Sequence, residues 1–271
     1  IGNKYGLVPD TFAFNIILNA HARNGDVQTV LSLLDDMRCA NLRPDAVSHC
    51  AVIQAFSRNG QALEARAWLE KVAGGADGCS QINEFCINGV LSALVKDSRH
   101  HQDAVDFFES VERTHGVERS VVGYNLMMSM AAGDRGTASI ESCEYWFNHM
   151  LQNQVSPSIV TFNTCLKAVA NMQVVDTNKA FQLLHQMDRF KMCGDAITYS
   201  TLIEIFAKAN RPADAVFWFR KMQERMPVND FALCRVVDAF SISGDAKNAR
   251  LWFAKLHTRD IVSYNTLLKV Y

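Results

Sequence analysis

The chain has 271 residues, of which 49% are apolar and 20% charged, a balance typical of a well-packed chain rather than a disordered one. Its 27 Lys and Arg against 28 Asp and Glu leave a formal charge of −1. This balance excludes a nucleic-acid partner held by a whole-chain cationic field, so local patches would have to hold one. There is no uninterrupted apolar run of eighteen residues, so we expect no membrane span.

The eight cysteines contain no C-x-x-C pair, and their spacings match neither a zinc motif nor the dense framework of a small secreted domain. We therefore expect them to be reduced and to behave as small buried hydrophobes, with no metal site and no cofactor. His100 and His101 are predicted to be solvated residues at the start of a helix.

Taken in chain order, the sequence repeats with a period near 35 residues. The first ten residues match the end of a repeat and the last eleven match the start of one, so we expect a segment of a longer array. The alignment predicts the end of a preceding repeat at 1–10, repeats 1 to 7 at 11–45, 46–83, 84–120, 121–158, 159–195, 196–229 and 230–260, and the start of a further repeat at 261–271.

Each repeat carries two apolar stripes at helical spacing, separated by turn-forming residues. The first stripe is an aromatic or apolar residue followed by an apolar pair such as Ile17-Leu18. The second is a small residue, a large one and a long apolar one. Each repeat is therefore predicted to be a helical hairpin, and because one hairpin cannot bury both stripes, neighbours are predicted to stack. All four tryptophans fall at the middle of the second stripe and are expected to be buried: Trp68, Trp146, Trp218 and Trp252.

Five short segments stand out among the repeats: the openings at 159–164, 196–203 and 261–267 and the endings at 33–37 and 42–45. They resemble the pentatricopeptide repeat family, and the resemblance covers essentially the whole chain. It implies an all-α fold, a right-handed α-solenoid of about seven full repeats, of which the 31-residue seventh is similar to the short variant of the family. The tetratricopeptide pattern is not present.

A polar column follows the aromatic residue of each opening. Asn is a poor helix-interior residue, so its recurrence there needs a reason. It could cap the helix or bond a neighbouring backbone, or its carboxamide could present a donor and an acceptor to the Watson–Crick edge of an unstacked base. The column consists of Asn15, Cys50, Asn88, Asn125, Asn163, Ser200, Cys234 and Asn265.

Similarity to the family implies that this residue and the last residue of its repeat together select one RNA base, read 5′ to 3′ as the protein runs N to C. A carboxylate only accepts and favours the N3–H of uracil, whereas a serine hydroxyl can also donate to N3 of cytosine. The implied preference is U-N-C-C-U-A-N, with gaps at the two cysteines. If Phe85 rather than Ile87 were the aromatic of repeat 3, Cys86 would replace Asn88 and the first C would be lost. The pairs are Asn15 with Asp45, Cys50 with Asn83, Asn88 with Ser120, Asn125 with Ser158, Asn163 with Asp195, Ser200 with Asn229, and Cys234 with Asp260.

Two further columns accompany the pairs. The residues two before each aromatic are all apolar and could sandwich bases, although ordinary packing between repeats explains them equally well. They are Phe12, Val47, Phe85, Val122, Val160, Ile197, Phe231 and Val262. At the ends of the first helices the family tends to place a phosphate-binding Lys, and the matching basic residues are Arg23, Arg58, Lys96 and Lys208.

Two functions stay open at this point. The first is sequence-selective binding of single-stranded RNA in organellar RNA metabolism (processing, stability, editing or translation), without chemistry of its own. The second is a protein-interaction scaffold or structural subunit of a large organellar complex such as a ribosome, which the near-zero charge and the cysteine gaps favour. We find no catalytic constellation, so no enzyme is expected. The resemblance implies a mitochondrion or chloroplast, although the sequence shows no targeting segment.

Overall fold

The computed structural model describes residues 10–75, 78, 82–133, 137–227, 230–258 and 260–271. Over these residues it contains fifteen α-helices, one short 3₁₀ turn and no strand, which confirms the all-α prediction. The chain divides into two compact parts, an N-terminal unit up to Met130 and a C-terminal unit from Ala131. Residues 1–9 of the preceding repeat predicted at 1–10, and Asn229, which is predicted to read a base, lie outside the described residues.

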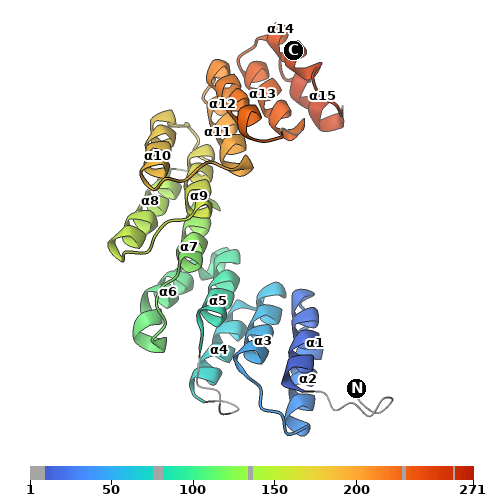
Figure 1. Ribbon diagram of the computed structural model, residues 1–271, viewed down its shortest axis with the longest axis vertical. Coiled ribbons are helices and arrows are strands. Elements are labelled where there is room, and N and C mark those ends of the chain that lie inside the picture. Colours follow the sequence, from blue (N-terminus) through green and yellow to red (C-terminus); the bar gives the residue numbers. More distant parts are fainter. Residues whose placement is uncertain (1–9, 76–77, 79–81, 134–136, 228–229, 259) are drawn as a thin grey trace. The chain divides into compact units, whose positions relative to one another are not determined.

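The N-terminal unit is a row of helical hairpins (Figure 1). α1 packs on α3 and α3 packs on α5, so the first helices of repeats 1 to 3 lie side by side. α2 and α4 each pack on their own first helix and on the next one. The elements are α1 (Thr11–Arg23), α2 (Val27–Cys39), α3 (Ala46–Arg58), α4 (Ala62–Ala73), α5 (Glu84–Lys96), η2 (Ser98–His100), α6 (His101–His115) and most of α7 (Val121–Gly133).

The C-terminal unit repeats the same arrangement (Figure 1). The first helices α9, α11, α13 and α15 pack in a row, and each second helix packs on the first helix that follows it. Stacking of successive hairpins is thus found within both units. The elements are α8 (Thr137–Gln152), α9 (Ile159–Ala170), α10 (Thr177–Arg189), α11 (Ala196–Lys208), α12 (Pro212–Arg225), α13 (Asp230–Ile242), α14 (Ala246–Phe253) and α15 (Ile261–Leu268).

Local sequence signals set where the helices begin and where the chain turns. Asp45 accepts from the backbone N–H of Ser48, and the Ser48 hydroxyl accepts from the backbone N–H of Asp45, which forms a capping box at the start of α3. The turns between paired helices hold Gly25 and Gly60 at φ of 72° and 73°, in the left-handed region that glycine enters without steric penalty. Asn210 takes the equivalent place before α12 at φ 56°.

The second-helix core differs from the prediction at the tryptophans. The small and the long apolar residues of the stripe are buried as predicted, for example Ala215 and Met222. Trp146 is buried, but the tryptophans of repeats 2, 6 and 7 are only half-buried, so the prediction is wrong for three of the four. In these repeats the following residue fills the core instead: Leu69, Phe219 and Phe253.

Each of these three indole rings comes one position before the buried residue, at the edge of the apolar stripe. A lysine on the same or the adjoining segment covers two of the rings: the ammonium of Lys71 lies 4.8 Å from the ring centre of Trp68, and that of Lys255 lies 3.8 Å from the ring centre of Trp252. Cation–π contact of this kind suits a ring with one face toward solvent.

The prediction that all cysteines are reduced and buried is also wrong. A disulfide joins Cys50 on α3 to Cys86 on α5, with the two Cα atoms 5.0 Å apart, and Cys39 and Cys193 are exposed. The bonded residues are 36 positions apart, about one repeat period, and adjacent first helices bring them together. The repeat alignment therefore contained the information needed to predict this disulfide, whereas a search for local cysteine motifs could not detect it.

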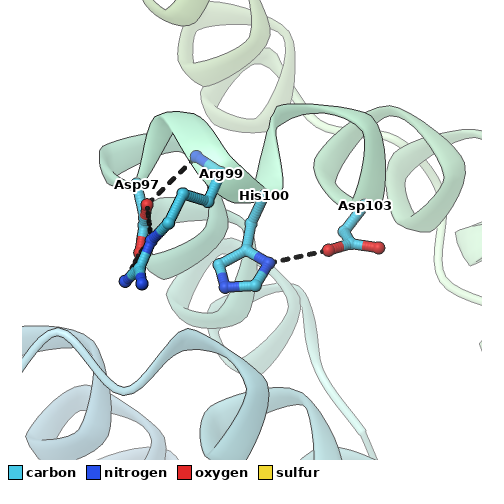
Figure 2. A network of polar contacts seen from close by, with 4 residues as sticks. All are labelled: Asp97, Arg99, His100 and Asp103. Atoms are coloured by element: carbon cyan, nitrogen blue, oxygen red, sulfur yellow. Dashed lines mark hydrogen bonds and ion pairs between the residues drawn. The ribbon is translucent and has the colours of Figure 1, made fainter.

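The turn between α5 and α6 holds a small polar network (Figure 2). Asp97 accepts from the guanidinium and from the backbone N–H of Arg99, and these hydrogen bonds lower the pKa of its carboxyl to about 2. His100 pairs with Asp103 at 2.8 Å and is half-buried, so its predicted solvation is wrong, although His101 does begin α6.

Candidate functional site

The residues of the predicted polar column occupy the same position in each first helix whose cap is described. In α1 the column residue Asn15 stands five positions after the capping residue Asp10, and the same spacing holds in every first helix with a described cap. Wherever a cap is described, the last residue of a repeat is the capping residue of the next first helix, as Asp45 is for α3 and Asp195 for α11. Both members of a predicted pair are therefore fixed to neighbouring helices.

Repeat 1 shows what this placement does. The Nδ2 of Asn15 donates to both carboxylate oxygens of Asp45, at 3.1 and 3.2 Å. The hydroxyl of Ser48, three residues into the next repeat, donates to Oδ1 of Asn15 at 2.7 Å. Asn15 is 8% exposed, and its carboxamide bridges two hairpins.

Repeat 5 reproduces the arrangement in the other unit. Asn163 Nδ2 donates to Asp195 Oδ1 at 3.1 Å, and Thr198 Oγ1 donates to Asn163 Oδ1 at 2.7 Å. Asn163 is also 8% exposed. The same three positions thus make the same contacts in two repeats far apart in the sequence.

Both aspartates are held as carboxylates. Burial acts most strongly and raises the pKa of Asp45, but hydrogen bonds from Ser48 and Asn15 outweigh it, so the pKa lies below its ordinary value. Asp195 has a lowered pKa for the same reason, with Thr198 and Asn163 as donors. Each site therefore presents a negatively charged acceptor at neutral pH.

The pairs of repeats 2 and 3 are built differently. Cys50 is committed to its disulfide, and its sulfur lies 3.4 Å from Oδ1 of Asn83. Asn88 exchanges long hydrogen bonds with Ser120, at 3.3 and 3.4 Å, and also donates to Glu84 at 3.2 Å.

The alternative register of repeat 3 does not match the geometry. Phe85 is 78% exposed, whereas Ile87 is 4% exposed and fills the core place of the aromatic. Asn88, the residue after Ile87, accordingly stands in the column and reaches Ser120.

The remaining column members make varied contacts. Ser200 turns back to the carbonyl of Ala196 at 2.7 Å. Burial, followed by the charge of Asp260, raises the pKa of the Cys234 thiol. Asn125 is half-buried on α7, and Asn265 is exposed on α15.

The predicted stacking column is on the surface. All eight side chains are exposed, from 47% at Val47 to 78% at Phe85. Packing between repeats therefore does not account for their apolar character. Contact with bases stays a prediction for these residues.

The predicted phosphate column divides into two kinds. Arg23, Arg58 and Lys96 are exposed and form no ion pair with any residue in the described part of the chain. Lys208 instead donates to the carbonyl of Ala170 at 2.7 Å, at the carboxyl end of α9, and pairs with Glu204 at 2.8 Å.

A charged cluster on the first helices of the C-terminal unit escaped the sequence analysis. Glu204 receives Lys167 from α9 at 3.4 Å, Lys208 from its own helix, and Arg235 from α13 at 3.8 Å. Burial is the largest influence on the Glu204 pKa and raises it, but these cations together lower it below its ordinary value. The signal was available, because the residues nine after each capping position are charged in this unit: Lys167, Glu204, Asp238 and Lys269.

Among the described residues, no helix is long and apolar enough to cross a membrane, and no group of three or more His, Cys, Asp or Glu side chains could hold a metal ion.

Family models match three parts of the chain. The model described as PPR repeat family matches residues 9–68, that of the pentatricopeptide repeat domain matches 107–172, and that of the PPR repeat matches 197–226. A chloroplastic pentatricopeptide repeat-containing protein of Arabidopsis thaliana is 25% identical over 227 residues, covering 82% of this chain and 28% of its own length. A mitochondrial one from the same plant is 24% identical over 226 residues and covers 80% of this chain. The chain thus spans about a quarter of the length of these two relatives.

Solved structures show the same fold. The pentatricopeptide repeat protein PPR10 from maize superimposes with a TM-score of 0.74 at 20% identity, over 98% of this chain and 37% of that one. PPR10 in complex with an 18-nt psaJ RNA element gives 0.73 at 19% identity, over 98% and 38%. The PPR domain of Arabidopsis thaliana protein-only RNase P 1, in complex with tRNA, gives 0.53 at 16% identity, over 66% and 94%.

Proposed function

Because the chain belongs to the pentatricopeptide repeat family, we propose that it binds single-stranded RNA selectively, one base per repeat, with the preference U-N-C-C-U-A-N. The protein supplies recognition and no covalent chemistry, so it acts by occupying its RNA site. The proposal includes a role in mitochondrial or plastid RNA metabolism, since several relatives are named as chloroplastic or mitochondrial.

One observation carries this proposal: the predicted reading residue and the last residue of its repeat touch each other in repeats 1, 3 and 5. Two side chains in direct contact can act as one hydrogen-bonding edge. With Asp as partner the edge combines an amide donor and a charged acceptor, and with Ser120 it includes a hydroxyl that donates or accepts. The Asp edge can accept from the N3–H of uracil, whereas the Ser120 hydroxyl can donate to N3 of cytosine.

The exposed apolar column supplies the second requirement. Its members stand three residues before the reading position in every first helix, so a base at the reading edge has an apolar side chain of the same repeat nearby. Stacking on apolar and aromatic side chains is tolerant of sequence and contributes about 1–3 kcal/mol per base. Selectivity would then come from the paired polar residues.

A protein-interaction scaffold is the second candidate, and the charge arrangement favours it. Lys167, Lys208 and Arg235 all pair with the Glu204 carboxylate, and Lys269 pairs with Asp238 at 2.7 Å. Cations engaged in this way contribute less to phosphate binding, and a neutral polar surface suits a protein partner.

Titration of the chain with a U-N-C-C-U-A-N oligonucleotide and with a scrambled one separates the two functions. We expect tighter binding of the matched RNA, with affinity falling as salt rises. Equal weak binding of both RNAs would remove the RNA-reading proposal and leave the scaffold.

A further inference from the structure

The third residue of a repeat stands against the reading residue of the repeat before it. Ser48 donates to Asn15 and Thr198 donates to Asn163, each at 2.7 Å, and each donor is almost fully buried. At the intervening junction of repeats 2 and 3 the same two positions hold Cys86 and Cys50, which are bonded covalently. The contact is therefore a regular feature of the repeat junction.

The hydroxyl and the aspartate together fix which way the carboxamide faces. A carboxamide can rotate by 180° and exchange its oxygen for its NH₂ group. With a hydroxyl donating to Oδ1 and the aspartate accepting from Nδ2, only one of the two orientations satisfies both partners. The reversed orientation would place Oδ1 against the carboxylate, which is repulsive, and would forfeit the short hydrogen bond that the hydroxyl donates to Oδ1, because the hydroxyl would have to turn its proton to the aspartate instead.

The fixed orientation determines the edge that a base meets. The second hydrogen of Asn163 Nδ2 is a donor, and beside it the carboxylate of Asp195 is an acceptor. Uracil offers the complement, because O4 accepts and N3–H donates. Cytosine offers a donor at N4 and an acceptor at N3, so it meets two like groups unless the carboxamide reverses.

Repeat 3 lacks this constraint. Its third-position neighbour is Gly123, which has no side chain to hold Asn88, and Asn88 divides its hydrogen bonds between Glu84 and Ser120. With neither a third-position hydroxyl nor a carboxylate partner, the Asn88 carboxamide can turn toward either pyrimidine.

We propose that the hydroxyl at the third position of the following repeat, Ser48 or Thr198, is a further specificity determinant that orients the reading asparagine and so excludes cytosine. Both are positioning residues, since they act through Asn15 and Asn163. This inference rests on the proposed function, because it assumes that RNA bases meet these asparagines.

The test compares RNA oligonucleotides that carry U or C at the fifth place of U-N-C-C-U-A-N. Thr198→Val keeps the shape of the side chain and removes the hydroxyl, and we expect it to lower the ratio of U to C affinity about five-fold, the effect of one net hydrogen bond. Thr198→Ser should restore the ratio. Ser48→Ala should lower selectivity at the first base alone.

Ser263→Ala is the matched control, because Ser263 occupies the same position but donates to the carbonyl of Asp260, and the preceding reading residue is Cys234. It should leave the selectivity of repeats 1 and 5 unchanged.

The outcomes separate the two proposals. If the unaltered chain prefers U at the fifth place and both Thr198→Val and Ser48→Ala keep that selectivity when folded, the orienting role is wrong and RNA reading stands. If the unaltered chain shows no preference for U, both proposals fall. Should Thr198→Val not fold, Ser48→Ala at the separate junction decides the matter.

Discussion

The two units have the same repeat register but differ in the charged residues on their first helices. Nine residues after the capping position, the N-terminal unit carries the neutral side chains Asn19, Gln54, Ser92 and Ser129, whereas the C-terminal unit carries Lys167, Glu204, Asp238 and Lys269. In the N-terminal unit the basic residues at the helix ends are exposed, while Lys208 is engaged with Ala170 and Glu204. One repeat geometry can therefore support a surface with available cations and one that neutralises itself.

The covalent difference between the units should give the largest effect. The N-terminal unit has the Cys50–Cys86 disulfide, whereas in the C-terminal unit Cys143 and Cys165 lie 3.4 Å apart without a bond. Closing a loop of 36 residues stabilises by up to about 4 kcal/mol in the chain-entropy model. Cys50→Ser should lower the free energy of unfolding by that order in denaturant titrations without reductant, and by little once a dithiol reductant is present.

Cys143→Ser is the matched control and should not alter the dependence on reductant. Thiol titration of the unreduced, unfolded chain should find two thiols fewer than in the reduced chain. An equal number would contradict the cross-link.

The available cations of the N-terminal unit should carry most of the salt dependence of RNA binding. Each phosphate contact on single strands contributes about 0.7 to the slope of log K against log salt. Replacing Arg23, Arg58 and Lys96 together by Gln should reduce the slope by about 2 and weaken binding about 100-fold near 0.1 M salt. Lys208→Gln is the matched control and should change affinity little, because its ammonium is already engaged. If Lys208→Gln weakened RNA binding as much as the triple variant does, the proposed difference between the units would be wrong.

Removing the central carboxylate of the C-terminal cluster should make that unit resemble the other. Glu204→Gln frees Lys167 and Arg235, so RNA binding should tighten a few-fold and its salt slope should steepen. The free energy of unfolding should fall by about 1 kcal/mol. Asp214→Asn, which removes an exposed pair with Arg211 on α12, is the control and should leave RNA binding unchanged.

The same carboxylate predicts a pH dependence. Since the Glu204 pKa is lowered in the folded chain, its contribution is present above the unfolded-state value near 4.5 and is lost as pH falls through the lower folded value. The difference in unfolding free energy between the unaltered chain and Glu204→Gln should shrink below about pH 4.5. A constant difference down to low pH would mean that the cluster does not stabilise the charged form.

Periodicity predicted the hairpins and the reading column because both depend on residues that recur at one place in each repeat. Asn15 and Asn163 could be located in this way, and the contact of each with the last residue of its repeat follows from the capping position. The burial of Trp68 was predicted wrongly because an apolar stripe defines the buried face of a helix only to within one residue. The neighbouring Leu69 is the residue that is buried.

Contacts that join two repeats were harder to predict. Within its own repeat, Ser48 is typical of a residue at the start of a helix. Only the stacking of α3 on α1 shows that its hydroxyl reaches Asn15. The sequence of its own helix likewise does not reveal the partners of Glu204, because its cations come from three different helices. Such partners depend on the distance between hairpins, which a period does not specify.

The most direct test of reading by register is a base swap at repeat 5. Asn163→Thr retains the Asp195 carboxylate, which can accept from N1–H and N2–H of guanine, and it replaces the carboxamide with a single hydroxyl. In titrations with oligonucleotides that differ only at the fifth base, we expect the preference to move from U toward G by about ten-fold. A folded Asn163→Thr chain that still prefers U would contradict the assignment of this repeat to that base.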